Sequence, residues 1–291
     1  MTRIIPALSD VSSQYDALFV DLWGCVHDGV TAIPSAVDAL KSYKKTGGCV
    51  VLVTNSPQPR EGVEIQLERF GVPQECWDTI ATSGDAARGA LGLGVVGEKV
   101  WFMGEWARDA RFFEPVDFLE SPVTVARVPL EEAEGIVCCG PFDPMADPST
   151  LRPELLYAKQ KGLKLLCANP DIVVERGETR EWCAGAVAKL YSEMGGESLY
   201  FGKPYPPIYD LARRRLAACG RDVADGRILA IGDGIGTDIK GARGEDIDSL
   251  FVTGGLARSE TKTSHQPDPD ALTHYLSKKM ISPTYAIGQL R

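Results

Sequence analysis

Acidic, basic and hydroxyl side chains follow short apolar runs at several places in this 291-residue chain. These residues are Asp21, Thr54, Asn55, Ser56, Lys203, Asp233 and Asp238. Carboxylates, a hydroxyl and an ammonium together suit a phosphoryl site, because Mg²⁺ takes a few protein carboxylates plus substrate oxygens, while Lys and Thr take the other phosphate oxygens. A free carboxylate there can also act as a nucleophile and form an aspartyl-phosphate.

Each of these residues alone has an ordinary structural explanation. A strand-end Asp often caps a helix, and Gly-Lys-Pro is a common turn. The ordered series D…TN…GKP…GDxxxTD is much less expected by chance, so the series favours a phosphoryl site over separate caps and turns.

The elements that would position these residues alternate between apolar, β-rich runs and helical stretches. The predicted strands are 17–21, 48–55, 99–103, 133–140, 163–171, 198–204, 227–234 and 248–255, and the predicted helices are 34–45, 60–70, 84–91, 151–161, 179–193, 205–219 and 238–243. Such alternation predicts an α/β fold, a Rossmann-like doubly wound parallel sheet with helices on both faces. Ligands of such sheets bind at the carboxyl ends of the strands, where the polar residues stand.

Composition and charge limit the kinds of partner and the cellular location that we expect for this chain. The net charge is −9 and the sequence pI about 5.0, so we expect no nucleic-acid partner. No apolar run reaches the 18 or more residues of a membrane span, and the N-terminal segment does not resemble a secretory signal. The eight Cys form no C-x-x-C pair, so we expect reduced, mostly buried thiols in a cytoplasmic protein and no zinc site.

The motif series resembles the haloacid dehalogenase (HAD) superfamily of phosphohydrolases. The matching segments are FVDLWGCVHDG (19–29), LVTNS (52–56), FGKP (201–204) and AIGDGIGTDIKGA (230–242). ATSGDAARGAL (81–91) and CANPD (167–171) resemble the type IIA branch, which carries a large α/β cap between the second and third motifs. Sugar-phosphate and 4-nitrophenyl phosphatases belong to this branch.

The resemblance implies a domain organisation and a ligand. Residues 1–83 and 197–291 would form the HAD core, and residues 84–196 an inserted α/β cap domain. The implied activity is a Mg²⁺-dependent phosphatase acting on a small phosphorylated metabolite. A homodimer through the cap is also implied.

Roles for individual residues follow from the resemblance alone. Asp21 would be the nucleophile and a metal ligand, Trp23 would offer its backbone carbonyl to the metal, and Asp233 would be the second metal carboxylate. Asp238 would hold metal waters or Lys203, which would neutralise charge between nucleophile and phosphate. Phosphoryl oxygens would be bound by Thr54, Asn55 and Ser56, while Asn169 and Asp171 would face the leaving group.

Trp23 departs from the family pattern. Phosphatases of this superfamily carry at that position an Asp that protonates the leaving oxygen and then activates water, which an indole cannot do. Loss of a general acid–base costs roughly 10²–10⁴ in rate. His27 and Asp28 are the nearest alternative proton donors in the sequence.

Three interpretations therefore stay open. The chain is a phosphatase that obtains its proton elsewhere, or a weakly active or non-catalytic protein that binds a phosphorylated metabolite. The third is a dehalogenase-type hydrolase, a class whose first motif can carry an aromatic residue at this position. The retained Asp233 and Asp238 argue against the dehalogenase, which needs no metal. We also expect that Trp23 packs under the cap and excludes water.

Overall fold

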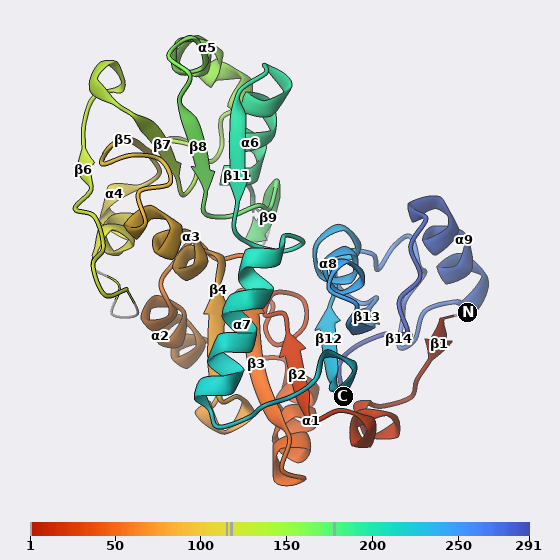
Figure 1. Cartoon of the computed structure of the whole chain (residues 1–291). Helices are drawn as coiled ribbons and strands as arrows, with labels where there is room; N and C mark the ends of the chain where they lie inside the picture. Colours follow the sequence, from red (N-terminus) through yellow and green to blue (C-terminus); the bar gives the residue numbers. More distant parts are fainter. Residues whose placement is uncertain (1, 115, 117–118, 177–178) are drawn as a thin grey trace. The chain divides into compact units, whose positions relative to one another are not determined.

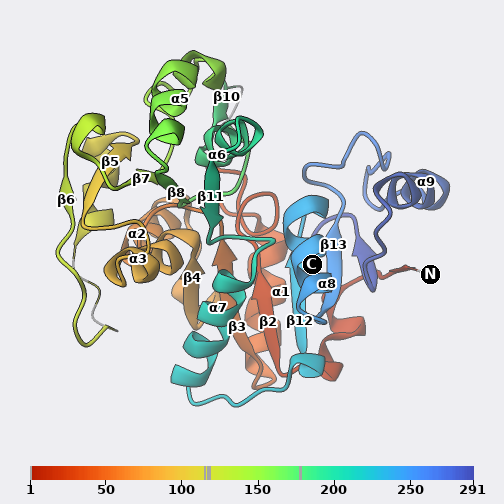
Figure 2. The same ribbon diagram turned by 45° about the horizontal axis from the view of Figure 1, so that its top comes forward.

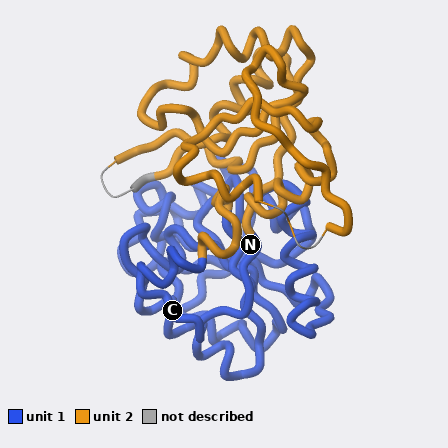
Figure 3. The backbone as a smooth tube through the Cα atoms, turned by 90° about the vertical axis from the view of Figure 1, so that its left-hand side faces the viewer, with its two compact units in different colours: residues 1–54, 64–81, 203–291 blue, residues 55–63, 82–202 orange. Residues whose placement is uncertain are grey.

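The computed structural model describes residues 2–114, 116, 119–176 and 179–291. The chain divides into two compact units (Figure 3). One unit comprises residues 1–54, 64–81 and 203–291, and the other comprises residues 55–63 and 82–202. The short segment 55–63 thus groups with the inserted unit, whereas the sequence analysis assigns it to the core.

The first unit is built on a seven-stranded sheet with strand order β1-β14-β13-β12-β2-β3-β4. The strands are β1 (Arg3–Ile4), β2 (Ala17–Val20), β3 (Cys49–Thr54), β4 (Thr79–Thr82), β12 (Ile228–Gly232), β13 (Asp248–Val252) and β14 (Tyr285–Ile287). All pairings from β1 through β3 are parallel, with Val20 opposite Leu52 on one side and Ile231 on the other. The central strands β2, β3 and β12 are buried along their whole length, as continuous apolar runs in a parallel sheet require.

Helices cover this sheet and several begin with proline, whose fixed φ suits the first helical turn. They are α1 (Pro34–Lys45), α2 (Arg60–Phe70), α7 (Pro206–Ala218), α8 (Lys240–Gly244) and α9 (Pro269–Lys279). Helices α1 and α7 both pack on β3, and Figure 1 shows α7 in front of the sheet. Helix α9 packs near β13 and β14 and lies close to the N-terminus in Figure 1 and Figure 2.

The second unit contains a five-stranded parallel sheet of order β11-β8-β7-β5-β6 and a two-stranded antiparallel sheet. The strands are β5 (Lys99–Met103), β6 (Ala126–Arg127), β7 (Gly135–Cys138), β8 (Lys164–Cys167), β9 (Val173–Arg176), β10 (Thr179–Trp182) and β11 (Glu197–Tyr200). The helices are α3 (Ser83–Gly92), α4 (Trp106–Asp109), α5 (Arg152–Gln160) and α6 (Ala184–Glu193). Helices α5 and α6 lie side by side (Figure 2).

Strand β7 shows how this second sheet is buried on both faces. Ile136 belongs to an apolar cluster with residues of α5 and α6, whereas its neighbour Val137 belongs to a cluster with residues of α3. Successive side chains of a strand point to opposite faces, so the two helical layers each cover one face. The predicted α/β fold with an α/β insertion is therefore confirmed.

Several predicted boundaries are wrong. The helix predicted over 179–193 begins at Ala184, because Thr179–Trp182 pairs with β9 as a strand. The strand predicted over 163–171 ends at Cys167, and the helix predicted over 238–243 is a π-helical turn, η8 (Ile235–Ile239), followed by α8.

No helix among the described residues is long and apolar enough to cross a membrane.

Leu18 tests the buried centre of the first unit. It is fully buried in β2, so Leu18→Ala removes apolar contacts and leaves a cavity, and we expect the free energy of unfolding to fall by about 2–5 kcal/mol. Val30→Ala is the control, because Val30 is 60% exposed and its loss should change that free energy by no more than about 0.5 kcal/mol. Urea unfolding followed by circular dichroism measures both, and equal effects would contradict the assigned burial.

Candidate active site

A buried ammonium joins two carboxylates at the carboxyl edge of the first unit's sheet. Asp21 directly follows β2, and its N–H donates to the carbonyl of Ile231 in β12 (2.8 Å). Lys203 donates from Nζ to Asp21 Oδ1 and to Asp238 Oδ1 (2.7 Å for the latter). All three residues are more than nine-tenths buried. The fold thus brings together residues that stand 182 and 35 positions apart in the chain.

Asp238 is held by the turn that carries it. Its second carboxylate oxygen accepts from the N–H of Gly234 (3.0 Å) and from the hydroxyl of Thr237 (3.3 Å). The π-helical turn η8 places this side chain back over the end of β12, and such turns are often found at functional sites.

Asp233 completes the cluster from the end of β12. One of its carboxylate oxygens accepts from the N–H of Leu256 in the loop after β13 (3.0 Å). Gly24 has φ +70°, and any Cβ there would overlap the Asp233 carboxylate. A side chain at position 24 would therefore displace Asp233 as well as strain the backbone.

Burial and mutual repulsion dominate the electrostatics of this cluster. Burial raises the pKa of the Asp21 carboxyl well above its usual range, and Asp238 and Asp233 add to the rise while Lys203 opposes it. For Lys203 burial lowers the pKa, but the carboxylates of Asp21 and Asp238 outweigh that effect and hold it well above the usual range. One ammonium thus faces three carboxylates in a poorly solvated place.

Trp23 packs within its own loop. Its ring lies edge-on to the imidazole of His27, with centroids 5.4 Å apart, and a Cβ at Gly29, where φ is +89°, would overlap the indole. His27 in turn contacts the ring of Phe70 at 4.9 Å. Trp23 therefore forms part of a small edge-to-face aromatic cluster around the loop that follows Asp21.

Neither alternative proton donor is arranged as a general acid at neutral pH. His27 is fully buried, its Nδ1 accepts from the N–H of Gly29 (3.1 Å), and burial lowers its pKa to about 4. Asp28 is exposed, and the N–H groups of Thr31 and Val30 hold its pKa below the usual range. His27 is thus neutral and Asp28 ionised at pH 7.

The remaining predicted residues fall on both units. Thr54 ends β3 in the first unit and is 3% exposed. In the second unit, the amide of Asn55 donates to Asp171 Oδ1 (2.8 Å), and the N–H of Asp171 donates to Asn169 Oδ1 (3.0 Å). The hydroxyl of Ser56 accepts from the N–H of Gln58 (3.2 Å). Because Asn55 follows Thr54 directly, one peptide bond links the Asn55–Asp171 pair to the end of β3.

Asn169 and Asp171 lie in an Asn-Pro-Asp turn. The side chain of Asn169 closes an Asx turn on Asp171. The same turn presents the Asp171 carboxylate to Asn55.

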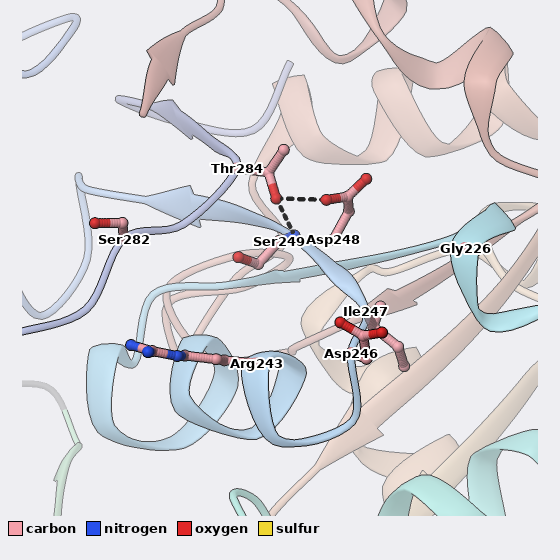
Figure 4. A pocket seen from close by; sticks show the side chains of 8 residues that line it. All are labelled: Gly226, Arg243, Asp246, Ile247, Asp248, Ser249, Ser282 and Thr284. Atoms are coloured by element: carbon pink, nitrogen blue, oxygen red, sulfur yellow. Dashed lines mark hydrogen bonds between the residues drawn. The ribbon is translucent and has the colours of Figure 1, made fainter. Parts of the chain in front are cut away.

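A separate hollow of about 250 Å³ opens at the opposite end of the sheet, where β13 begins (Figure 4). It is lined by Gly226, Arg243, Asp246, Ile247, Asp248, Ser249, Ser282 and Thr284. The Asp248 carboxylate already accepts from the hydroxyls of Tyr15 and Thr284 (2.8 and 2.7 Å). This hollow lies away from the strand ends that carry Asp21 and Asp233, so it forms no part of the candidate active site.

Comparisons with known proteins identify the family. One family model, of haloacid dehalogenase-like hydrolases, matches residues 18–118, and a second, HAD-hydrolase-like, matches residues 200–278. A crystal structure of a haloacid dehalogenase-like family hydrolase from Brucella suis 1330 is 35% identical, with 99% of this chain and 100% of that chain covered and a TM-score of 0.84. The chain belongs to the haloacid dehalogenase-like hydrolase family.

More distant members of this family extend the comparison. Human glycerol-3-phosphate phosphatase is 26% identical over 300 residues, which cover 96% of this chain and 89% of that protein. A glycerol phosphate phosphatase from Mycobacterium tuberculosis, in complex with magnesium, shares the fold at 22% identity and a TM-score of 0.67, over 96% of this chain and 76% of that one. The prediction of a HAD-type hydrolase with a type IIA insertion is thereby confirmed.

The donor set of this haloacid dehalogenase-like hydrolase fits a divalent metal ion. One carboxylate oxygen each from Asp21 and Asp233, with Cys25 Sγ, lie within 4.8 Å of one another. Three buried carboxylates against one ammonium leave an excess of negative charge, which a divalent cation would balance. The sequence analysis includes Asp21 and Asp233 but misses Cys25, although Cys25 stands only four residues after Asp21.

A substitution at Gly24 tests how closely the backbone at this position approaches the Asp233 carboxylate. Gly24→Ala should lower the free energy of unfolding by about 1–2 kcal/mol, because φ is positive there and the new methyl group overlaps the carboxylate. Gly236→Ala is the matched control, since a Cβ at that position meets open space. Thermal unfolding compares the two, and an equally stable Gly24→Ala protein would contradict this geometry.

His27 offers a test of pH dependence. Its pKa falls from the usual 6.5 to about 4 on folding, so the unfolded chain binds the proton more readily, and stability is lost as the pH falls from about 6.5 to about 4. The loss attributable to His27 should be about 3 kcal/mol.

The His27→Asn variant keeps an acceptor for the Gly29 N–H and removes this titration. Its stability, measured by urea unfolding from pH 7 to pH 4, should fall less steeply than that of the unchanged protein. Val30→Ala, an exposed substitution that removes no titratable group, should leave the slope unchanged. Parallel slopes for the unchanged protein and His27→Asn would show that His27 does not titrate as described.

Proposed function

We propose that this chain is a Mg²⁺-dependent phosphatase that hydrolyses the phosphate monoester of a small metabolite, such as a sugar phosphate, through an aspartyl-phosphate on Asp21. The observation that carries the proposal is the Lys203 ammonium held between Asp21 and Asp238, with Asp233 beside them. With a divalent cation held by Asp21 and Asp233, the cation and Lys203 together would offer positive charge to the negative oxygens of an arriving phosphoryl group.

In this proposal a carboxylate oxygen of Asp21 bonds to the phosphorus atom while the ester P–O bond breaks, and the leaving alkoxide takes its proton from water, since neither His27 nor Asp28 is arranged to supply one. Lys203 donates hydrogen bonds from a fixed position, so it reduces repulsion between the nucleophile and the phosphoryl oxygens. Thr54 contributes its hydroxyl, and Asn55 and Ser56 bind the remaining phosphoryl oxygens. A second attack, by water on the phosphorus, releases phosphate and restores the Asp21 carboxylate.

Asp21, Asp233 and the Trp23 carbonyl would hold Mg²⁺, with Asp238 in support. The bound cation would neutralise charge on the phosphoryl oxygens and favour the ionised form of Asp21.

Two relatives and two residues of the inserted unit support the proposed substrate class. Two relatives are named as phosphatases of glycerol phosphate, a small polar phosphomonoester. We assign Asn169 and Asp171 to the leaving-group side, because the Asp171 carboxylate is bonded to Asn55, next to Thr54 in the chain. A polar pair there favours a hydroxylated leaving group over an apolar one.

Trp23 supports a second candidate, a weakly active or non-catalytic protein that binds a phosphorylated metabolite. The indole occupies the family's acid–base position, His27 is neutral, and Asp28 is bonded to its own turn. A dehalogenase is a weaker candidate, because such an enzyme has no use for Asp233 and Asp238 as a metal-binding pair.

Phosphate release from a panel of phosphorylated metabolites and 4-nitrophenyl phosphate tests the proposal. Assays with Mg²⁺, with EDTA and with the Asp21→Asn variant should show release only in the first case. Absence of release, together with Mg²⁺-dependent binding of a phosphorylated metabolite, would favour the binding protein.

The Trp23→Asp variant tests how much the rate of phosphate release is lowered by the indole at this position. If turnover is limited by a missing acid–base group, this variant should release phosphate about 10²-fold faster or more than the unchanged protein, because a positioned carboxyl can protonate the leaving oxygen. Trp23→Asn is the matched control, since it has the same shape as Asp but cannot transfer the proton. Equal rates for the two variants would show that the missing acid–base group does not limit turnover.

A further inference from the structure

Cys25 has an unusual position for a buried cysteine. It lies in the loop that follows Asp21, where its N–H and that of Val26 both donate to the carbonyl of Leu22 (3.3 and 2.8 Å). Its exposed fraction is 0%. A buried free cysteine ordinarily acts as a small hydrophobic side chain in apolar surroundings.

The surroundings of Cys25 are different. Its Sγ lies within 4.8 Å of a carboxylate oxygen of Asp21 and of one of Asp233, and those two residues are 9% and 6% exposed. Among the described residues, this is the one group of three side chains with metal-ligating atoms so close together. The thiol therefore stands beside two buried carboxylates that already suit a cation.

Sulfur changes the metal preference of such a site. Carboxylate oxygens are hard donors that suit Mg²⁺, whereas a thiolate is a soft donor that selects Zn²⁺ and similar ions. When a thiol binds a metal ion, the metal–sulfur bond forms and the sulfur's proton passes to solvent. A thiophilic ion would thus form a bond to the Cys25 sulfur, whereas Mg²⁺ binds sulfur only weakly.

We propose that Cys25 makes this a mixed oxygen–sulfur site, which binds thiophilic divalent ions such as Zn²⁺ and Cd²⁺ through Sγ as well as through Asp21 and Asp233. The inference rests on the metal site of the proposed function. As a consequence, thiophilic ions displace Mg²⁺ and inhibit phosphate release. The strength of this inhibition depends on the bond to Cys25.

Cd²⁺ alone is the probe, and sulfur-to-cadmium charge-transfer absorption in the ultraviolet is the readout. The parent protein is the full chain with Cys219→Ser, which removes the exposed thiol. Cys25→Ala and Cys25→Ser are made in this parent. Cys76→Ala is the matched control, because Cys76 is equally buried in the same unit and donates to the Val37 carbonyl (3.8 Å) instead.

The parent and Cys76→Ala should show the band with one Cd²⁺ bound, and both Cys25 variants should lose it. Cd²⁺ affinity by calorimetry should fall about tenfold or more in those variants, while Mg²⁺ affinity stays within about twofold. Asp233→Asn, which keeps Cys25, should also lose the band. Thermal unfolding verifies that each variant is folded. If one variant does not fold, the presence or absence of the absorption band in the parent protein still tests the proposal.

A parent without the band, or a band that persists in Cys25→Ala, would overturn the proposal. Mg²⁺-dependent phosphate release is measured on the same parent protein, so that failure of the Cys25 proposal can be distinguished from failure of the proposed phosphatase function. Release without the band overturns only the role of Cys25, whereas the band without release overturns only the phosphatase.

Discussion

The sharing of one buried ammonium by two carboxylates is the interaction on which the site depends. Lys203 sits between Asp21 and Asp238, and all three side chains are withdrawn from water. Removal of one partner from a buried ion pair typically costs about 3–5 kcal/mol, because the other charge is left unpaired. The strand ends that carry these residues are therefore bound to one another by the site as well as by the sheet.

The parallel sheet makes this sharing possible. Polar groups at the ends of β2, β3 and β12 reach the same edge only because these strands run in one direction and lie next to one another. Within the site, glycine at position 24 leaves room for the Asp233 carboxylate, and the π-helical turn η8 returns Asp238 toward Lys203. Burial by the sheet then makes each unpaired charge costly, which favours a cation among the carboxylates.

The loop after Asp21 brings carboxylates that suit a cation together with aromatic side chains. Trp23, His27 and Phe70 form an edge-to-face cluster, and Trp23 stands at the position where the resemblance implies a proton-transferring Asp. Cys25 adds a thiol beside the carboxylates. The thiol and the indole thus set the chemistry that this loop offers beside Asp21.

The sequence by itself determined the α/β class, the family and the residues at the strand ends, because apolar runs ending in polar residues are a local pattern. It did not determine the pairing of β14 between β13 and β1, since those strands are specified by distant partners. It also did not determine the β9–β10 pair, because the helix predicted over 179–193 includes the residues of β10. Nor did it determine that His27 is neutral or that Cys25 lies near Asp233. Those properties come from burial and from contacts between residues far apart in the chain, which only the tertiary structure decides.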